Sequence, residues 1–180
     1  KDEDKTYKFA KLYNIFNIEQ TGIELPEIEL RPTKLERPYE IAQALNVEVK
    51  SAPHHNPSYS PSRDLIRMPM PGQFESDDAH QSTFYHECIH ATGHHSRLDR
   101  DMTGSFGSED YAKEEFVAEL GSVFLCAELG VTYDIQQHAS YFNSWQKAIE
   151  SDPKYLLTAA RKASEYCMSQ FTLMRKYEAA

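Results

Sequence analysis

The sequence has few positively charged residues and no long hydrophobic run. Its 19 lysines and arginines are outnumbered by 28 aspartates and glutamates, which gives a formal net charge of -9. Because phosphate backbones attract basic surfaces, this balance argues against nucleic-acid binding by this segment. The best apolar stretch, residues 116–129, is interrupted by two glutamates and is shorter than the roughly 18 residues that a membrane-spanning helix needs. We therefore expect no membrane association.

Cysteine is also scarce. The three cysteines, Cys88, Cys126 and Cys167, are odd in number, far apart and placed in apolar segments. This arrangement favours buried, reduced thiols over a disulfide framework. The first residues, KDEDKTYKFAK, contain neither an initiator methionine nor the apolar core of a signal peptide. We expect a cytoplasmic protein, and a segment cut from a longer chain.

The composition is that of a folded protein, because 40% of the residues are hydrophobic and 26% are charged. Residues 7–18 alternate between apolar and polar positions, which predicts a strand, and a proline-rich arm follows. We expect residues 1–35 to be an N-terminal strand and arm, and residues 36–180 to form one compact domain.

The pattern of the main domain changes from strands to helices along the chain. The apolar spacing predicts a short helix at 39–46, strands at 47–50 and 65–68, and helices at 79–92, 109–129 and 135–150. A last helix is expected from Pro153, with Asp152 as its N-cap. Gly93 is expected to end the first long helix in a left-handed conformation. This order predicts an α+β fold in which a small sheet packs against several helices.

The segment FYHECIHATGHH contains the pattern HExxH at His86, Glu87 and His90. On a helix, residues four apart lie one turn above each other, so both imidazoles can reach one metal ion. Glu87 then lies about 100° round the helix from His86, beside the metal. The pattern predicts two metal ligands with a carboxylate base between them.

A third protein ligand is needed, because catalytic zinc sites usually have three protein ligands and an open fourth position. The longer pattern HExxHxxGxxH would supply a histidine at position 96, but Ser96 stands there. His94 and His95 lie beside that position, beyond the expected end of the helix at Gly93. We expect both to be loop residues without a role in metal binding.

Better candidates lie downstream, in YAKEEFVAELGSVF. Glu115 and Glu119 are four residues apart on a predicted helix, and like charges at this spacing repel each other. Facing inward, they would need a cation, which Glu115 can bind as third ligand while Glu119 accepts a hydrogen bond from a ligand histidine. Glu114 and Glu119 remain alternative third ligands, although Glu114 is expected to face solvent with Lys113.

These residues predict a zinc site with His86, His90 and Glu115 as ligands and a fourth position open to water. Zinc lowers the pKa of such a water and polarises a carbonyl, and Glu87 can take the proton as general base. Zinc suits two imidazoles and one carboxylate better than manganese or cobalt. The expected reaction is hydrolysis of a peptide bond.

Several other polar residues are candidates for supporting roles. Tyr59, Tyr85 and Tyr111 can each stabilise an oxyanion, although a packing role is the default for any one of 11 tyrosines. Arg97 and Arg100 can form a small anion site, but ion pairs with neighbouring acids or with the helix carboxylates are the expected arrangement.

The segments HECIHATGHHSRLDR and YAKEEFVAELGSVFLCAELG together resemble the zincin-like metallopeptidase domain of ArdC-type antirestriction proteins. The resemblance covers about residues 9–170 and implies a gluzincin-type fold in a protein of bacterial mobile elements. By position it implies that His86 and His90 are ligands, that Glu87 is catalytic, and that residues 114–119 contain the third ligand.

Members of this family carry a single-stranded-DNA-binding domain ahead of the peptidase. The resemblance implies that residues 1–35 are the tail of such a domain, and that single-stranded DNA is bound only through the missing part. The leading hypothesis is a zinc-dependent metallopeptidase that cleaves a protein or peptide in the bacterial cytoplasm. The alternative is a zinc-stabilised binding module that docks a DNA-processing or restriction protein without cutting it.

Overall fold

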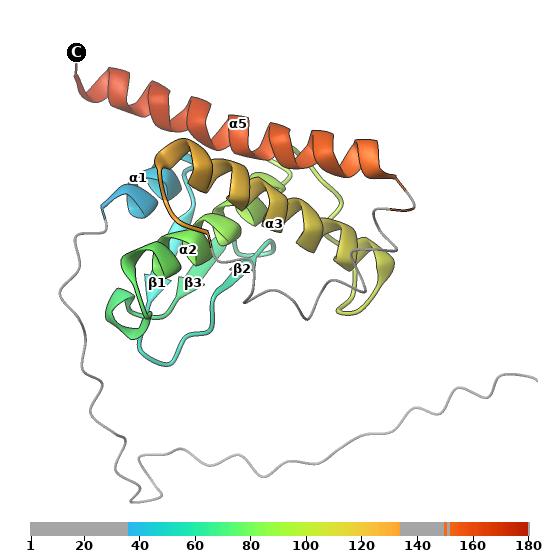
Figure 1. Ribbon diagram of the computed structural model, residues 1–180, viewed down its shortest axis with the longest axis horizontal. Helices are drawn as coiled ribbons and strands as arrows, with labels where there is room; N and C mark the ends of the chain where they lie inside the picture. Colours follow the sequence, from blue (N-terminus) through green and yellow to red (C-terminus); the bar gives the residue numbers. More distant parts are fainter. Residues whose placement is uncertain (1–35, 134–149, 151, 180) are drawn as a thin grey trace, which may run out of the picture.

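The computed structural model describes residues 36–133, 150 and 152–179 of the chain (Figure 1). Four α-helices and one three-stranded sheet form the framework of this part. The strand expected at 7–18 lies outside the described residues, and so does the helix expected at 135–150, apart from its last residue. The predicted α+β class is confirmed for the part of the chain that is described.

The sheet is formed by β1 (Glu48–Ser51), β2 (Ser58–Ser60) and β3 (Leu65–Met68), in the order β1-β3-β2. β3 pairs in parallel with β1 and antiparallel with β2. The two predicted strands are confirmed within one residue, whereas β2 falls in a segment that the sequence presents as a loop. Prolines flank β2 and its residues are not apolar at alternate positions, so pairing with β3 makes it a strand. β2 forms one edge of the described sheet.

The helices are α1 (Arg37–Ala44), α2 (Asp77–Thr92), α3 (Glu109–Leu129) and α5 (Pro153–Glu178). All four begin within two residues of the predicted positions. Ser76, Ser108 and Asp152 precede the three long helices and accept hydrogen bonds from backbone N–H groups of the first turn. α3 ends at Gly130, whose φ of 71° is a left-handed conformation that favours glycine. Within the described residues, none of the helices has both the length and the apolar composition to cross a membrane.

Gly93 ends α2 by a different mechanism from the one predicted. Its φ is -73°, so the expected left-handed conformation is wrong. The glycine is needed for space, because a Cβ there would lie 2.7 Å from Sδ of Met102 and 3.0 Å from Nη2 of Arg100. Both side chains come from the loop after α2 and pack over the end of the helix.

α2 lies at the centre of the molecule, between the sheet and the helices α3 and α5 (Figure 1). Phe84 and Ile89 of α2 are fully buried, and burial of side chains of this size stabilises a fold by about 1.5–3 kcal/mol each. Cys88, Cys126 and Cys167 are buried and free, as predicted from their apolar surroundings. The residues of HExxH are therefore carried by a helix that is held on several sides.

Candidate metal centre

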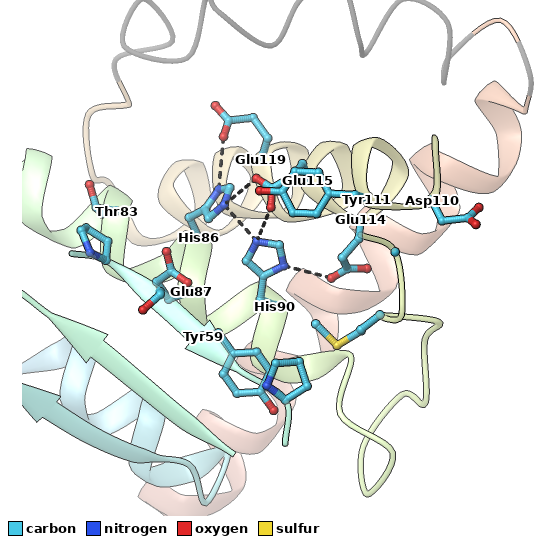
Figure 2. Close-up of a pocket in the computed structure, with 15 residues that line it drawn as sticks. Tyr59, Thr83, His86, Glu87, His90, Asp110, Tyr111, Glu114, Glu115 and Glu119 are labelled. Atoms are coloured by element: carbon cyan, nitrogen blue, oxygen red, sulfur yellow. Dashed lines mark hydrogen bonds and ion pairs between the residues drawn. The ribbon is translucent and has the colours of Figure 1, made fainter. Parts of the chain in front are cut away.

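The two histidines of the HExxH pattern lie side by side on α2 (Figure 2). Nε2 of His86 and Nε2 of His90 are 3.1 Å apart, as the one-turn separation of their Cα atoms permits. Both imidazoles are almost buried, with 13% and 11% of their side chains exposed. The helix therefore brings both rings to one point, as the spacing predicts.

α3 brings Glu115 to the same point. Its carboxylate oxygens lie 3.7 Å from Nε2 of His86 and 3.5 Å from Nε2 of His90. Donor atoms of these three residues all lie within 4.8 Å of one another, which is a spacing that can hold a metal ion. In a tetrahedral zinc site with bonds of about 2.0–2.1 Å, neighbouring donors are about 3.3–3.4 Å apart. The observed separations of 3.1, 3.5 and 3.7 Å fit this geometry.

Each imidazole also has a carboxylate at its other nitrogen. Nδ1 of His86 lies 3.2 Å from Glu119, and Nδ1 of His90 lies 3.1 Å from Glu114 (Figure 2). A carboxylate beside Nδ1 favours a proton on that nitrogen, which leaves the lone pair of the neutral ring on Nε2. Two such lone pairs, on atoms 3.1 Å apart, repel each other unless they share a cation. The arrangement therefore favours a bound cation, as a metal centre requires.

Glu114 is the residue whose environment differs most from the expectation. The helical pattern places it in solvent beside Lys113, but its side chain is only 11% exposed and contacts His90. Arg100 donates to both of its oxygens, over 2.7 and 3.0 Å. Burial alone would raise the pKa of Glu114, but hydrogen bonds from Arg100 and His90 keep that pKa below its usual value. The prediction of a solvent-facing Glu114 is wrong, because the loop after α2 covers this part of α3 with a buried cation.

Glu119 lies where the sequence places it, at the outer nitrogen of a histidine. Its carboxylate is buried, and the hydroxyl of Tyr133 donates to it. No local pattern in the sequence points to Tyr133, because it lies beyond the end of α3. Of the three glutamates left open as third ligand, Glu114 and Glu119 reach Nδ1 atoms, and Glu115 faces both Nε2 atoms.

The carboxylates stabilise positive charge on the two histidines. Burial would lower the pKa of His86, but its interactions with Glu115 and Glu119 raise it from 6.5 to about 9. Burial would also lower the pKa of His90, but the interactions with Glu114 and Glu115 raise it from 6.5 to about 10. The same contacts outweigh the burial of Glu115 and hold its pKa well below the usual range. Positive charge is therefore stabilised at this point of the structure, a property that a metal site requires.

Glu87 lies beside the two histidines in a cleft of about 510 Å³, lined by residues of β2, α2, α3 and the loop before α3 (Figure 2). It is 6% exposed, and burial raises the pKa of its carboxyl group above the usual value. The nearby charges of His86 and His90 oppose part of this rise. A buried carboxyl group with a raised pKa that borders a cleft has the properties of a general base.

The three candidate tyrosines differ in position. Tyr85 is fully buried, and its hydroxyl donates to Gln81, so it has a packing role. Tyr59 and Tyr111 both line the cleft, but the hydroxyl of Tyr59 donates to Asp64 over 2.8 Å. The stabilisation of an oxyanion stays a prediction for Tyr111.

The remaining candidates lie in the loop after α2. His94 and His95 belong to it, as expected, and Nδ1 of His94 is 2.7 Å from Oγ of Ser96. Arg97 forms two hydrogen bonds of 2.8 Å with Asp64, from the turn before β3, and not with a neighbouring acid. Its charge is therefore balanced within the protein.

A comparison with protein families gives a match over most of this chain. The family model described as zincin-like metallopeptidase matches residues 36–162. This range contains the sheet, α2 and α3, and therefore every residue of the candidate centre.

Curated relatives are longer than this chain. Two Escherichia coli proteins named DNA primase TraC are 43% and 40% identical to it over 154 and 157 residues. These alignments cover 84% and 87% of this chain, but only 14% and 11% of the relatives. The protein y4eC of Sinorhizobium fredii is 37% identical over 164 residues, which is 87% of this chain and 52% of that protein. The chain thus spans about half or less of the length of these relatives.

Two crystal structures of the antirestriction protein ArdC from plasmid R388 are similar to this chain. The Mn(II)-bound structure has a TM-score of 0.68 at 32% identity, and the match covers 82% of this chain and 58% of the ArdC chain. The metal-free structure has a TM-score of 0.67 at 32% identity, with 78% and 52% covered. The likeness therefore extends over more than three quarters of this chain.

Proposed function

The chain belongs to the zincin-like metallopeptidase family, and we propose that it acts as a zinc-dependent peptidase domain that hydrolyses peptide bonds of a protein substrate. The observation that carries this proposal is the meeting of three donor residues and the buried carboxyl group of Glu87 at an open cleft. A structural zinc site is usually closed by four protein ligands. A site with three donors beside a cleft keeps room for water and for a substrate.

In this proposal, His86, His90 and Glu115 hold the metal ion. Two imidazoles and one carboxylate with an open position suit zinc. Bound zinc supplies Lewis acidity, which polarises a carbonyl group and makes water acidic enough to lose a proton near neutral pH. Glu114 and Glu119 orient the two imidazoles through their Nδ1 atoms, at 3.1 and 3.2 Å.

Glu87 moves the proton in this proposal. Its carboxylate takes a proton from the attacking water and later passes it to the nitrogen of the leaving amine. The raised pKa of Glu87 suits both steps, because a base with a pKa nearer to neutrality holds the proton until it is returned.

The surrounding protein and its partners are part of the same proposal. The similarity to ArdC supports an antirestriction role for the longer protein that contains this domain, in the bacterial cytoplasm. A protein or peptide is the proposed substrate, because a net charge of -9 disfavours contact with a phosphate backbone. Single-stranded DNA would be bound by a separate domain ahead of residue 36.

Metal analysis and peptide cleavage test this proposal together. The purified protein is expected to contain about one zinc ion per chain and to cleave at least one member of a fluorogenic peptide library. Glu87→Gln should keep the zinc and lose cleavage, whereas Glu115→Gln should lose both. A protein that binds no zinc would contradict the metal site. Antirestriction activity that survives Glu87→Gln in the longer protein would favour the zinc-stabilised binding module.

A further inference from the structure

Arg100 reaches the candidate metal centre from the loop between α2 and α3. Its Nε donates to Oε2 of Glu114 over 3.0 Å, and its Nη2 donates to Oε1 over 2.7 Å. Oε1 also lies 3.1 Å from Nδ1 of His90 (Figure 2). One carboxylate oxygen therefore joins the guanidinium of Arg100 to the imidazole of His90.

We propose that Arg100 is a positioning residue of the metal centre, which strengthens zinc binding by holding Glu114 against His90. The proposal rests on the metal site proposed above and extends it to a residue outside both helices. Without Arg100, Glu114 would be a nearly buried carboxylate without its charged partner, and it would turn away from His90 towards water. The imidazole of His90 would then lose the contact that orients it.

The guanidinium of Arg100 is itself fixed against the end of α2. It donates to the hydroxyl of Thr92 over 2.7 Å and to the carbonyl of Ile89 over 2.8 Å. These two bonds come in addition to the two that it makes with Glu114. Four hydrogen bonds give the planar guanidinium a single orientation. Its bidentate contact with Glu114 therefore also sets the orientation of the carboxylate. The contact thereby ties α3 to the helix that carries His90.

Gly93 makes room for this arrangement. A Cβ at this position would lie 3.0 Å from Nη2 and 3.1 Å from Cζ of Arg100. The φ of Gly93 is -73°, which any residue adopts, so space explains the glycine. The same Cβ would lie closer still to Sδ of Met102, at 2.7 Å, so both side chains of the loop use the space that the glycine leaves.

Arg97 offers a matched control in the same loop. It is as buried as Arg100, with 5% against 7% of the side chain exposed, and it also holds a carboxylate through two hydrogen bonds. Like Arg100, it donates to a carbonyl near the end of α2, that of Ala91. Its carboxylate belongs to Asp64, which accepts a hydrogen bond from Tyr59 rather than from a histidine of the centre.

Competition with a chromogenic chelator measures the zinc affinity of each variant, after circular dichroism has shown that it is folded. Arg100→Gln is expected to weaken zinc binding by about 10–100-fold, the range for partners that orient a metal-bound histidine. Arg97→Gln removes a comparable ion pair and is expected to change the affinity by less than about threefold. The difference in zinc affinity between the two variants shows whether Arg100 positions a ligand histidine or only stabilises the loop.

A double variant tests the route through Glu114. Glu114→Gln is expected to weaken zinc binding by about as much as Arg100→Gln, since both break the same contact. Adding Arg100→Gln to Glu114→Gln should then weaken binding by less than about a further threefold. Losses that multiply in the double variant would show that Arg100 acts by another route and would overturn the proposal.

Wild-type zinc affinity in Arg100→Gln would also overturn the proposal. If Arg100→Gln does not fold, Arg100→Lys replaces it, because lysine keeps the positive charge but cannot donate to both carboxylate oxygens in the planar geometry of arginine. Wild-type affinity in Arg100→Lys would have the same meaning. A wild-type protein that binds no zinc would refute the metal site and this inference together. A protein that binds zinc without cleaving peptides would contradict the peptidase alone, and the affinities would still decide the role of Arg100.

Discussion

Replacing Arg97 by alanine tests how the loop after α2 holds the domain together. The guanidinium of Arg97 donates to both oxygens of Asp64 and to three backbone carbonyl groups, those of Leu45, Asn46 and Ala91. These partners belong to the end of α1, the turn before β3 and the end of α2. The substitution therefore disconnects three segments that are distant in the sequence.

The expected loss of stability follows from these contacts and their burial. A hydrogen bond to a charged group contributes about 1.5–3 kcal/mol, and removing one partner of a buried ion pair costs about 3–5 kcal/mol. The side chain of Arg97 is 5% exposed, but that of Asp64 is 28% exposed, so water replaces part of what Asp64 loses. We therefore expect Arg97→Ala to lower the free energy of unfolding by about 3 kcal/mol. For a domain of this size, the melting temperature should fall by roughly 6–12 °C.

Urea unfolding followed by far-UV circular dichroism, at one fixed zinc concentration, measures this loss. Asp64→Asn removes the charge of the partner and keeps its shape. With Arg97→Ala and the double variant it forms a double-mutant cycle, in which we expect a coupling energy of about 1–3 kcal/mol. A loss below about 1 kcal/mol in Arg97→Ala would refute the reasoning, because that is the contribution of an exposed ion pair.

Three further predictions concern the centre and its helix. Glu87→Gln should reduce peptide cleavage by about 10²-fold or more without changing the zinc content, and an unchanged rate in the fluorogenic assay would remove Glu87 from the mechanism. Removing zinc with a chelator should lower the melting temperature seen by calorimetry, because an ion at 100 times its Kd stabilises the folded state by about 2.7 kcal/mol. Glu115→Gln should show no such shift, and a shift of wild-type size in that variant would exclude Glu115 as a ligand. Burial lowers the pKa of His80 from 6.5 to about 4, so the unfolded chain takes up this proton first as the pH falls. The free energy of unfolding therefore has its full value above pH 6.5, and it falls by up to about 3 kcal/mol as the pH falls to about 4. His80→Phe should remove this part of the pH dependence in urea unfolding, and equal slopes in both proteins would contradict it.

Features that depend on neighbours within a few residues could be predicted from the sequence. The four-residue spacing of His86 and His90 lets their Nε2 atoms meet on an α-helix, and the apolar spacing predicts the start of that helix within two residues. Glu115 and Glu119 share a face of α3 for the same reason. The family resemblance read from these segments is confirmed by the zincin-like family match and by the likeness to ArdC.

The surroundings of these residues depend on segments that meet only in the folded protein. Helical geometry predicts that Glu114 lies on the solvent side of α3. Its burial becomes favourable because Arg100, from the loop before α3, pairs with it. A paired carboxylate loses less free energy on leaving water than an unpaired one. Arg97 likewise pairs with Asp64, 33 residues away, rather than with the acids beside it. The expected pairing with a helix carboxylate is confirmed for Arg100, but local periodicity carries no information about which partner is chosen, so Glu114 and Asp64 are identified only in the folded chain.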